Sequence, residues 1–291
     1  MKLIKEDMEI KSLVNTSLDE LFGAFEQAFA DYEIQIDKDE HLAMLKRRGF
    51  NPALSFAAFD GSKIVSFTCN GIGNFYGVPT AYDTGTGTLK EYRGKGLATQ
   101  VFEFSIPYLK QAGIEEYLLE VLQHNTGAVS VYSKIGFEVT REFYYYRVQT
   151  DQIRNEVKTI DLPYTLKPID LNEYSAIIPG FWDFKPSWQN SLESISRSSE
   201  GFISLGAFIE DNLIGYGVFE PAAGDVTQIA VDRQHRRKGF GSLLFQAMLE
   251  NNKCDSVKII NTDIGCDSIT AFLASKNIAP TGKQFEMRKR L

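Results

Sequence analysis

The hydrophobic pattern of the chain alternates between two periods, one typical of strands and one typical of helices. Residues 54–59 and 63–70 are apolar-rich runs on either side of Asp60-Gly61, which predicts a β-hairpin. Residues 15–20 form a helix-start signature and are followed by apolar residues at helical spacing. Together, these strand and helix signals predict an α/β fold with a mixed sheet.

The order of the expected elements repeats in the two halves of the chain. In the first half, the hairpin is followed by a strand, a long helix, a central strand, a short helix and a last strand, at 81–88, 97–112, 117–122, 128–134 and 143–148. In the second half, a hairpin at 202–209 and 213–219 is followed by the same elements at 226–231, 240–248, 257–261, 268–276 and 285–288. The chain therefore consists of two copies of one unit.

The boundary between the copies is expected where the aromatic residues end and the sequence turns charged. This stretch begins near Gln149 and reaches Leu162. We expect an N-terminal domain at 1–149, a linker at 150–162 and a C-terminal domain at 163–291. With 291 residues and 43% hydrophobic content, the chain can form two cores of ordinary size.

Composition excludes several classes of partner and of binding site. A net charge of −7 argues against a surface that embraces nucleic acid or anionic lipid. The charged start at 1–7 and the lack of a long apolar run predict a cytoplasmic protein without a membrane segment. Three cysteines and three scattered histidines predict neither a disulfide framework nor a metal site.

The most informative motif is Arg-x-x-Gly-x-Gly/Ala, which occurs at 93–98 and again at 236–241, an offset of 143 residues. Each copy lies between a predicted strand and a predicted helix. Backbone N–H groups at a helix start, glycines without Cβ atoms and nearby basic side chains form a site suited to a phosphate. The loop could instead be an ordinary glycine turn with solvated charges, but the recurrence of the whole pattern favours the phosphate site.

Other phosphate and nucleic-acid motifs do not match. A Walker A loop would need glycine at the position of Leu89, and a dinucleotide fingerprint would need a third glycine at Thr99. The basic run at 235–238 is too short, in an acidic chain, to indicate a nucleic-acid partner.

The first motif continues into a second one. Residues 119–121 are Leu-Glu-Val, and they precede Asn125-x-x-Ala-x-x-Val-Tyr132-x-x-x-Gly136-Phe137. Together with the loop, this pattern resembles the GNAT superfamily of acyl-CoA-dependent N-acyltransferases. The resemblance implies two tandem GNAT-like domains, each a mostly antiparallel sheet with splayed central parallel strands and flanking helices.

The resemblance also implies acetyl-CoA as the co-substrate. Its pyrophosphate would rest on the loop amides, and its pantetheine arm would lie between the strand that ends near Thr88 and the strand at 117–122. The cofactor-binding residues are then expected to be Thr88, Arg93, Gly94, Lys95, Gly96, Leu97, Ala98 and Asn125, with Arg236, Arg237, Lys238, Gly239, Phe240 and Gly241 in the second copy.

Three catalytic residues are expected in the N-terminal domain. The resemblance makes Tyr132 the acid that protonates the departing thiolate, although a tyrosine among apolar helix residues could also serve packing alone. Asp83 and Glu120 are candidate bases for the attacking amine. Direct transfer requires neither a metal nor a covalent intermediate.

The second copy departs from the pattern, because Leu273 stands at the tyrosine position, Cys266 at the position of Asn125 and Asn277 at the glycine of the turn. We therefore expect acetyl transfer to a primary amine in the N-terminal domain. The alternatives are an active C-terminal domain, where Asp225 supplies a carboxylate, and a non-catalytic acyl-CoA sensor. The acceptor is a small-molecule amine or a protein amine, and residues 181–188 either line its pocket or serve packing.

Overall fold

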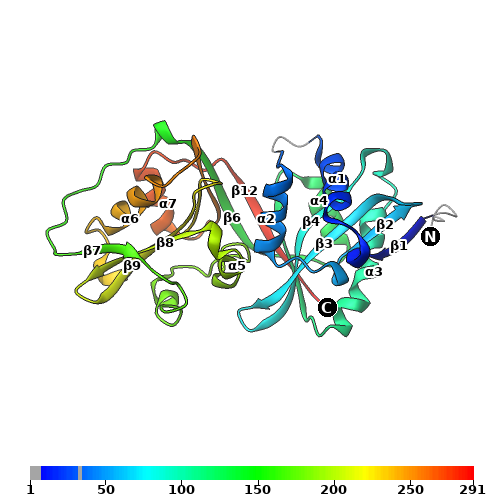
Figure 1. The fold of residues 1–291 in the computed structure, drawn as a ribbon, viewed down its shortest axis with the longest axis horizontal. Coiled ribbons are helices and arrows are strands. Elements are labelled where there is room, and N and C mark those ends of the chain that lie inside the picture. The colour runs from blue at the N-terminus through cyan, green and yellow to red at the C-terminus, as the bar shows by residue number, and fades with distance from the viewer. Residues whose placement is uncertain (1–7, 32–34) are drawn as a thin grey trace. The chain divides into compact units, whose positions relative to one another are not determined.

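The computed structural model describes residues 8–31 and 35–291 and divides into two compact units (Figure 1). Unit 1 holds the chain up to Thr140 together with Glu286–Leu291, and unit 2 holds Arg141–Phe285. The charged start of the chain, residues 1–7, on which the expected location partly rests, lies outside the described residues.

Unit 1 is a sheet flanked by helices, with the strand order β1-β2-β3-β4-β5-β12. The strands β1 to β4 pair antiparallel, and β4 pairs parallel with β5. Its strands are β1 Met8–Ser12, β2 Phe56–Asp60, β3 Lys63–Phe75, β4 Val78–Thr88 and β5 Glu116–Leu122. Its helices are α1 Leu18–Phe29, α2 Lys38–Arg48, α3 Leu97–Gln111 and α4 Thr126–Lys134.

Local sequence signals explain where the first two helices begin. Ser17 and Glu20 form a reciprocal capping box at α1, as the sequence predicted. Asp37 and Glu40 form a second capping box at α2, which the hydrophobic pattern did not predict. This helix was missed because its buried positions are mostly polar, His41 and Arg47 among them, so no apolar stripe marks it.

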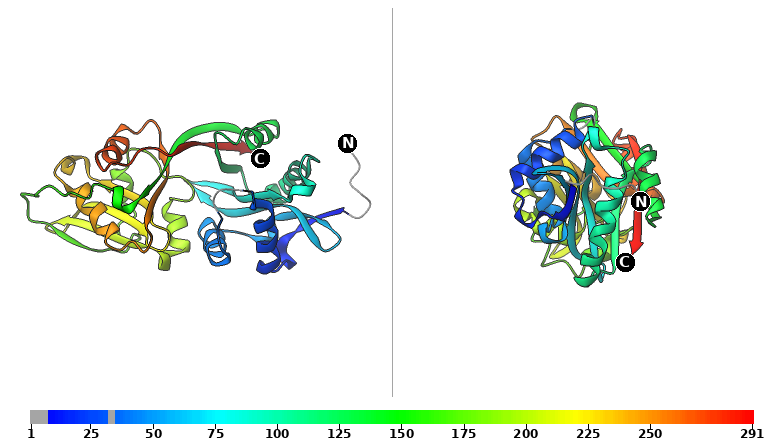
Figure 2. Two further views of the ribbon diagram at one scale, coloured as in Figure 1. Left: turned by 90° about the horizontal axis from the view of Figure 1, so that it is seen from above. Right: turned by 90° about the vertical axis from the view of Figure 1, so that its right-hand side faces the viewer.

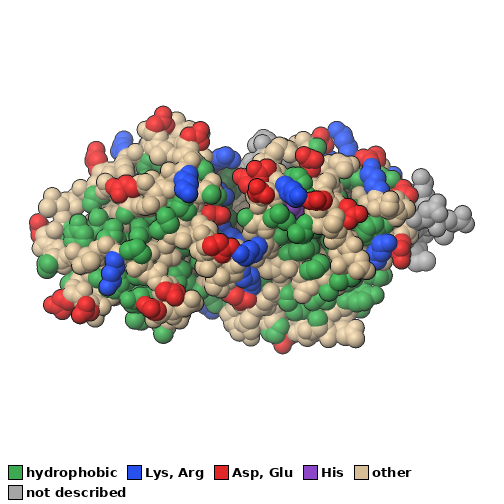
Figure 3. Space-filling model, viewed as in Figure 1, with side chains coloured by type: hydrophobic (Ala, Val, Ile, Leu, Met, Phe, Trp, Pro, Cys, Tyr) green, Lys and Arg blue, Asp and Glu red, His purple; other side chains and the backbone are tan. Residues whose placement is uncertain are grey.

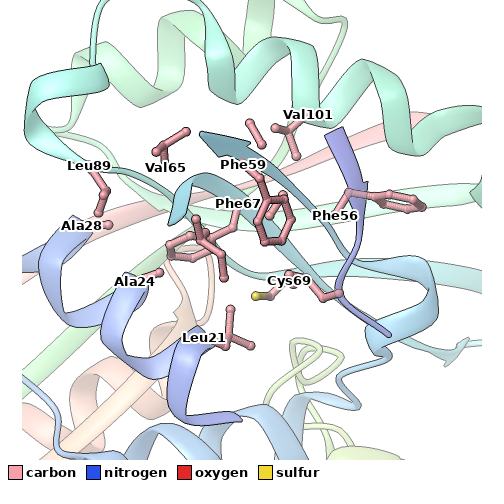
Figure 4. Packing of buried hydrophobic residues seen from close by; sticks show 14 of the residues in the cluster. Leu21, Ala24, Ala28, Phe56, Phe59, Val65, Phe67, Cys69, Leu89 and Val101 are labelled. Carbon is pink, nitrogen blue, oxygen red and sulfur yellow. The ribbon is translucent and has the colours of Figure 1, made fainter. Parts of the chain in front are cut away.

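The core of unit 1 lies between α1 and the sheet (Figure 4). Leu21, Ala24 and Ala28 of α1 face the sheet residues Phe67 and Cys69. Cys69 is almost fully buried, and burial raises the pKa of its thiol far above the ordinary value. Cys69 therefore serves as a small apolar residue of this core.

Unit 2 repeats this architecture with the strand order β6-β11-β10-β9-β8-β7. The strands β10 and β11 pair parallel, whereas β9 pairs antiparallel with β10 and β8, β7 with β8, and β6 with β11. Its strands include β7 Thr165–Pro168, β8 Ile203–Ile209, β9 Asn212–Glu220, β10 Asp225–Val231 and β11 Ser256–Asp263. Its helices are α5 Leu192–Arg197, α6 Phe240–Leu249 and α7 Asp267–Ser275. The mixed α/β fold with two similar units is therefore confirmed.

Two strands do not stay with the half of the sequence to which they were expected to belong. The strand β6, Glu138–Gln149, pairs with β11 of unit 2 from Phe143 onward. The strand β12, Gly282–Arg290, supplies its last residues to unit 1. Figure 2 shows β6 and β12 side by side. The run 143–148, expected to end the N-terminal domain, therefore completes unit 2 instead, and 286–288 completes unit 1.

Within the described residues, no helix is both long enough and apolar enough to cross a membrane.

Candidate active site

The loop between β4 and α3 in unit 1 adopts the conformation that an anion site needs. Gly94 and Gly96 both have left-handed backbone, with φ of 73° and 77°, and Gly96 is the N-cap of α3. A Cβ added to Gly94 would meet no atom within 4 Å. The first N–H groups of a helix have no partner within the helix, so this loop presents donors toward open space.

The corresponding loop in unit 2 has the same backbone but a different first residue. Gly239 is the N-cap of α6, with φ of 101°. Arg237 takes the position of Gly94, with φ of 63°, a conformation in which a non-glycine residue is uncommon. The backbone geometry of the loop is therefore kept in both units, although its sequence is not.

The first arginine of the motif in unit 1 is bound to the protein itself. The Arg93 guanidinium donates from Nε to the carbonyl of Thr88 at 3.1 Å and from Nη2 to the carbonyl of Ala28 at 2.7 Å. Its Nη1 lies 3.2 Å from a carboxylate oxygen of Asp31. Arg93 thus joins the loop to the end of α1, and phosphate contact by its side chain stays a prediction.

Arg236 makes the same set of contacts in unit 2. Its Nε donates to the carbonyl of Val231 at 2.9 Å, and its Nη2 donates to the carbonyl of Phe181 at 3.0 Å. Its Nη1 lies 2.8 Å from a carboxylate oxygen of Asp183. The motif arginine is therefore a clamp in both units, which explains why it recurs without assigning it to a ligand.

The remaining basic residues of the loops are exposed. Lys95 donates to the carbonyl of Glu91 at 2.8 Å and lies over the ring of Tyr92, and Lys238 is exposed as well. On the face shown in Figure 3, lysine and arginine side chains are interspersed with carboxylates. The face in view therefore carries mixed charge rather than one extended basic patch.

The parallel strands separate beside each loop. In unit 1, β4 and β5 pair only from Thr80–Glu116 to Tyr82–Leu118, although both strands continue. Thr84 then forms a bulge in β4, and Thr227 forms a bulge at the same offset of 143 residues in β10. Because the pairing ends early, backbone groups of both strands are available to a ligand between them, as the splayed strands of the resemblance imply.

Tyr132 and Asp83 meet where these strands separate. The Tyr132 hydroxyl, on α4, donates to Oδ2 of Asp83, on β4, at 3.0 Å. The Asp83 carboxylate also accepts from the Thr86 hydroxyl and from the Gly85 N–H, both at 2.9 Å. Two residues that lie 49 positions apart in the sequence thus form one hydrogen-bonded pair.

The Asp83 carboxyl is an unusually good proton acceptor for an aspartate. Burial raises its pKa above the ordinary value, since the charged form loses hydration. The hydrogen bonds from Thr86, Tyr132 and Gly85 stabilise the charge and offset part of this rise. A carboxyl with a raised pKa, in contact with a tyrosine hydroxyl, is a typical arrangement for proton transfer.

The third expected residue, Glu120 on β5, contacts a different tyrosine, Tyr82 on β4. Its Oε2 accepts a hydrogen bond from the Tyr82 hydroxyl. Burial, and next the charge of Glu120, raises the pKa of Tyr82 well above the ordinary value.

Several residues near this pair were not singled out from the sequence. Tyr117 donates to the Asn70 side chain, and Arg48 donates to the carbonyl of Thr84 at 2.8 Å, at the bulge. The Arg48 guanidinium also lies over the Tyr82 ring, 6.0 Å from its centroid. No motif marks these positions, and Arg48 ends the unpredicted helix α2.

Asn125 has a role within the protein. It is the N-cap of α4, and its side-chain oxygen accepts from the Ala128 N–H at 3.2 Å. This contact gives Asn125 a role in starting α4, and its expected contact with the cofactor stays a prediction. In unit 2, Cys266 is the N-cap of α7 without a side-chain cap.

Unit 2 does not reproduce the pair of unit 1. Leu273, at the tyrosine position, is buried in the unit 2 core. Asp225 is fully buried on β10, in register with Lys258 of the parallel strand β11. Asn277 stands in place of the glycine turn, with left-handed backbone at φ of 63°.

Unit 2 nevertheless contains a cavity of about 560 Å³ beside its loop. In the segment expected to line an acceptor pocket or to serve packing, Trp182 and Phe184 line this cavity and Trp188 is buried. Binding of an acceptor in the cavity stays a prediction. Trp182 donates to the Tyr216 hydroxyl at 2.7 Å, and Tyr216 contacts Gln228. Neutral hydrogen-bonding groups therefore meet at this wall of the cavity.

The comparisons with known proteins agree with this fold. A family model described as the Acetyltransferase (GNAT) family matches residues 15–137 and 169–264. A solved structure of a tandem GNAT protein from the clavulanic acid biosynthesis pathway has a TM-score of 0.75 and 16% identity, over 97% of this chain and 98% of that one. At this identity, the likeness shows the fold alone.

Curated relatives match shorter stretches. N-alpha-acetyltransferase 30 of Schizosaccharomyces pombe (strain 972 / ATCC 24843) is 31% identical over 105 residues, 35% of this chain and 70% of that protein. N-alpha-acetyltransferase MAK3 of Arabidopsis thaliana is 30% identical over 95 residues, 33% of this chain. The match spans half of the length of the Arabidopsis protein.

Proposed function

Because the chain belongs to the acetyltransferase (GNAT) family, we propose that it moves the acetyl group of acetyl-CoA to a primary amine, and that unit 1 carries out the reaction. The observation that carries this proposal is the hydrogen bond between Tyr132 and Asp83, beside the separated strands and the open loop. Unit 2 has leucine where unit 1 has this tyrosine, and supplies no matching acid.

The pair accounts for both proton transfers of a direct attack. The amine nitrogen bonds to the thioester carbon while its proton passes to the Asp83 carboxylate. As the carbon–sulfur bond breaks, the Tyr132 hydroxyl gives its proton to the sulfur. The Tyr132 oxygen then recovers a proton from the Asp83 carboxyl across the 3.0 Å contact, which restores the pair without an outside reagent.

The acceptor amine belongs to one of two classes, a peptide or protein amine or a small-molecule amine. The two curated relatives are named N-alpha-acetyltransferases, which favours the N-terminal amine of a peptide or protein as one candidate. A small-molecule amine is the other candidate.

A thiol-release assay with acetyl-CoA and an amine panel tests the activity. The panel contains a polyamine, an amino sugar, an amino acid and a peptide with a free N-terminus. We expect CoA release that depends on at least one of these amines. Binding of acetyl-CoA without release for any of them would instead support a non-catalytic acyl-CoA sensor.

A matched pair of charge reversals identifies the active unit. Lys95→Glu places a negative charge beside the unit 1 loop, and Lys238→Glu does the same in unit 2. We expect Lys95→Glu to raise the KM for acetyl-CoA about tenfold or more, since like charges repel at an exposed anion site. Loss of activity confined to Lys238→Glu would assign the reaction to unit 2.

A further inference from the structure

The two loops differ in what lies against them. In unit 1, a Cβ on Gly96 would meet only the side-chain amide of Gln100, at 3.8 Å, and Gly96 is exposed. In unit 2, a Cβ on Gly239 would meet Cγ1 of Ile160 at 3.0 Å and the carbonyl oxygen of Lys158 at 3.4 Å. Equivalent glycines therefore face open space in one unit and a segment of the chain in the other.

The segment at Gly239 consists of residues 153–160 and is called the strap below. Hydrogen bonds and apolar contacts hold it against the rest of unit 2. The Arg154 N–H donates to the carbonyl of Lys276 at 3.0 Å, and the Lys276 ammonium donates to the carbonyl of Glu156 at 2.8 Å. Ile153 and Ile160 pack against the unit 2 core. These contacts fix the strap rather than leave it as a free linker.

The strap also shares a wall with the cavity of unit 2. Arg154, Glu156 and Lys158 line that cavity together with Gly239 and Gly241 of the loop. The strap therefore lies on the side of the loop that faces the cavity. A phosphate would have to approach the loop from this side.

At Gly239 itself, the strap presents a carbonyl oxygen and an apolar side chain to the loop, although its Arg154 and Lys158 side chains carry positive charge. A phosphate group on the loop must reach the N–H donors at the start of α6. The Lys158 carbonyl oxygen carries partial negative charge and cannot donate a hydrogen bond to a phosphate oxygen. The Ile160 side chain offers only apolar surface, which cannot solvate a charged diphosphate.

We propose that the strap fills the space that a diphosphate needs at the unit 2 loop, so that CoA binds once per chain, at the loop of unit 1. The cavity of unit 2 is then open only to molecules that do not place a diphosphate on that loop. This inference rests on the proposed function in one respect, which is that CoA is the diphosphate chosen as the probe.

The test is the stoichiometry of CoA binding by titration calorimetry to the full chain and to the variant Ile160→Ser/Lys276→Met. The first change removes the side chain beside Gly239, and the second removes the ammonium that holds Glu156 while keeping the apolar stem. We expect one CoA per chain for the parent and two for the variant. Adding Lys238→Glu to the variant should remove the gained site.

The control is Ile203→Ser, which changes a partly buried isoleucine on β8 of the same unit. Tryptophan fluorescence reports the folding of unit 2, because both tryptophans, Trp182 and Trp188, belong to it. Should the double variant fail to fold, Lys276→Met alone carries the test, since it releases Glu156 without exposing core.

Two CoA molecules on the parent chain, or no gained site in a folded strap variant, would overturn the inference. No CoA on the parent would contradict the proposed function instead, and the strap would still be judged by whether its release adds a site. Failure of the function and failure of the strap thus give different binding curves.

Discussion

At the scale of single residues, Asp83 combines burial with three hydrogen-bond donors. Burial alone would make its charged form unfavourable, and the donors Thr86, Tyr132 and Gly85 restore part of the loss. A base must be ionised to take a proton, so the pKa of Asp83 sets the lower limit of the active pH range in the proposed mechanism.

The first prediction concerns Asp83→Asn. We expect kcat to fall by about 10²- to 10⁴-fold, the usual contribution of a general base. In the parent, kcat/KM should rise with pH through a pKa above the ordinary aspartate value, because burial raises the pKa of Asp83. The acceptor amine adds its own rise, so the ratio of parent to variant rates across pH isolates Asp83. A constant ratio would exclude Asp83 as the base.

The same pKa shift affects stability. Folding raises the pKa of Asp83, so the folded chain holds a proton there more tightly than the unfolded chain does. The stabilisation from this group is complete at pH values below the unfolded-state pKa and is lost as pH rises through the folded-state pKa. The ionised carboxylate that catalysis needs is thus the less stable form in the folded chain.

Sequence reasoning singled out Tyr132, Asp83 and Asn125. The structure joins Tyr132 to Asp83 by a hydrogen bond, while the catalytic and binding roles of all three residues stay predictions. It did not identify Tyr82, which donates to Glu120, or Arg48, which lies over the Tyr82 ring. Those contacts depend on the placement of α2 and on strand register, which are set by tertiary packing rather than by local pattern.

At the scale of elements, the packing of α1 against β4 depends on a glycine. A Cβ on Gly87 would lie 2.7 Å from the Phe67 ring and 2.9 Å from Cβ of Ala28. A Cβ on Gly85, two residues earlier on the same strand, would lie 3.7 Å from the nearest atom, on Phe25. The same substitution at these two positions therefore separates close packing from backbone effects.

The second prediction is that Gly87→Ala destabilises unit 1 by about 1–3 kcal/mol, the usual cost of overpacking a core, and that Gly85→Ala costs less. Urea unfolding followed by far-UV circular dichroism measures both. Equal stability of the two variants would show that α1 can move away from β4 at little cost.

At the scale of the whole molecule, each unit depends on a strand from the distant part of the chain. In unit 1, the buried Glu286 accepts from the Thr140 hydroxyl at 2.9 Å, and Arg288 pairs with Glu116 at 3.4 Å. The Leu291 N–H donates to the carbonyl of Glu115 at 2.9 Å. The order of elements was predictable from the repeat, but this exchange was not, because strand pairing between distant segments leaves no local signal.

The third prediction is that deleting 286–291 abolishes acetyl transfer while unit 2 stays folded. The deletion removes the part of β12 that belongs to unit 1, and β12 is the neighbour of β5 in the sheet. The strand β5 carries Glu120 and is one of the two strands that separate at the site. Tryptophan fluorescence should be unchanged, since both tryptophans lie in unit 2. The far-UV circular dichroism of the chain should be reduced, because unit 1 loses part of its secondary structure. Full activity after this deletion would show that the β12 residues do not support the site.

The division of labour between the units is the central claim, and Tyr132→Phe tests it most directly. This change removes only the hydroxyl that donates to Asp83, while the ring can keep its edge contact with Phe137, at a centroid distance of 5.7 Å. The measurement is kcat with the accepted amine, together with the Kd for acetyl-CoA. We predict that kcat falls by about 10²-fold or more while Kd changes by less than about twofold. An unchanged kcat would contradict the assignment of the reaction to the Asp83–Tyr132 pair of unit 1.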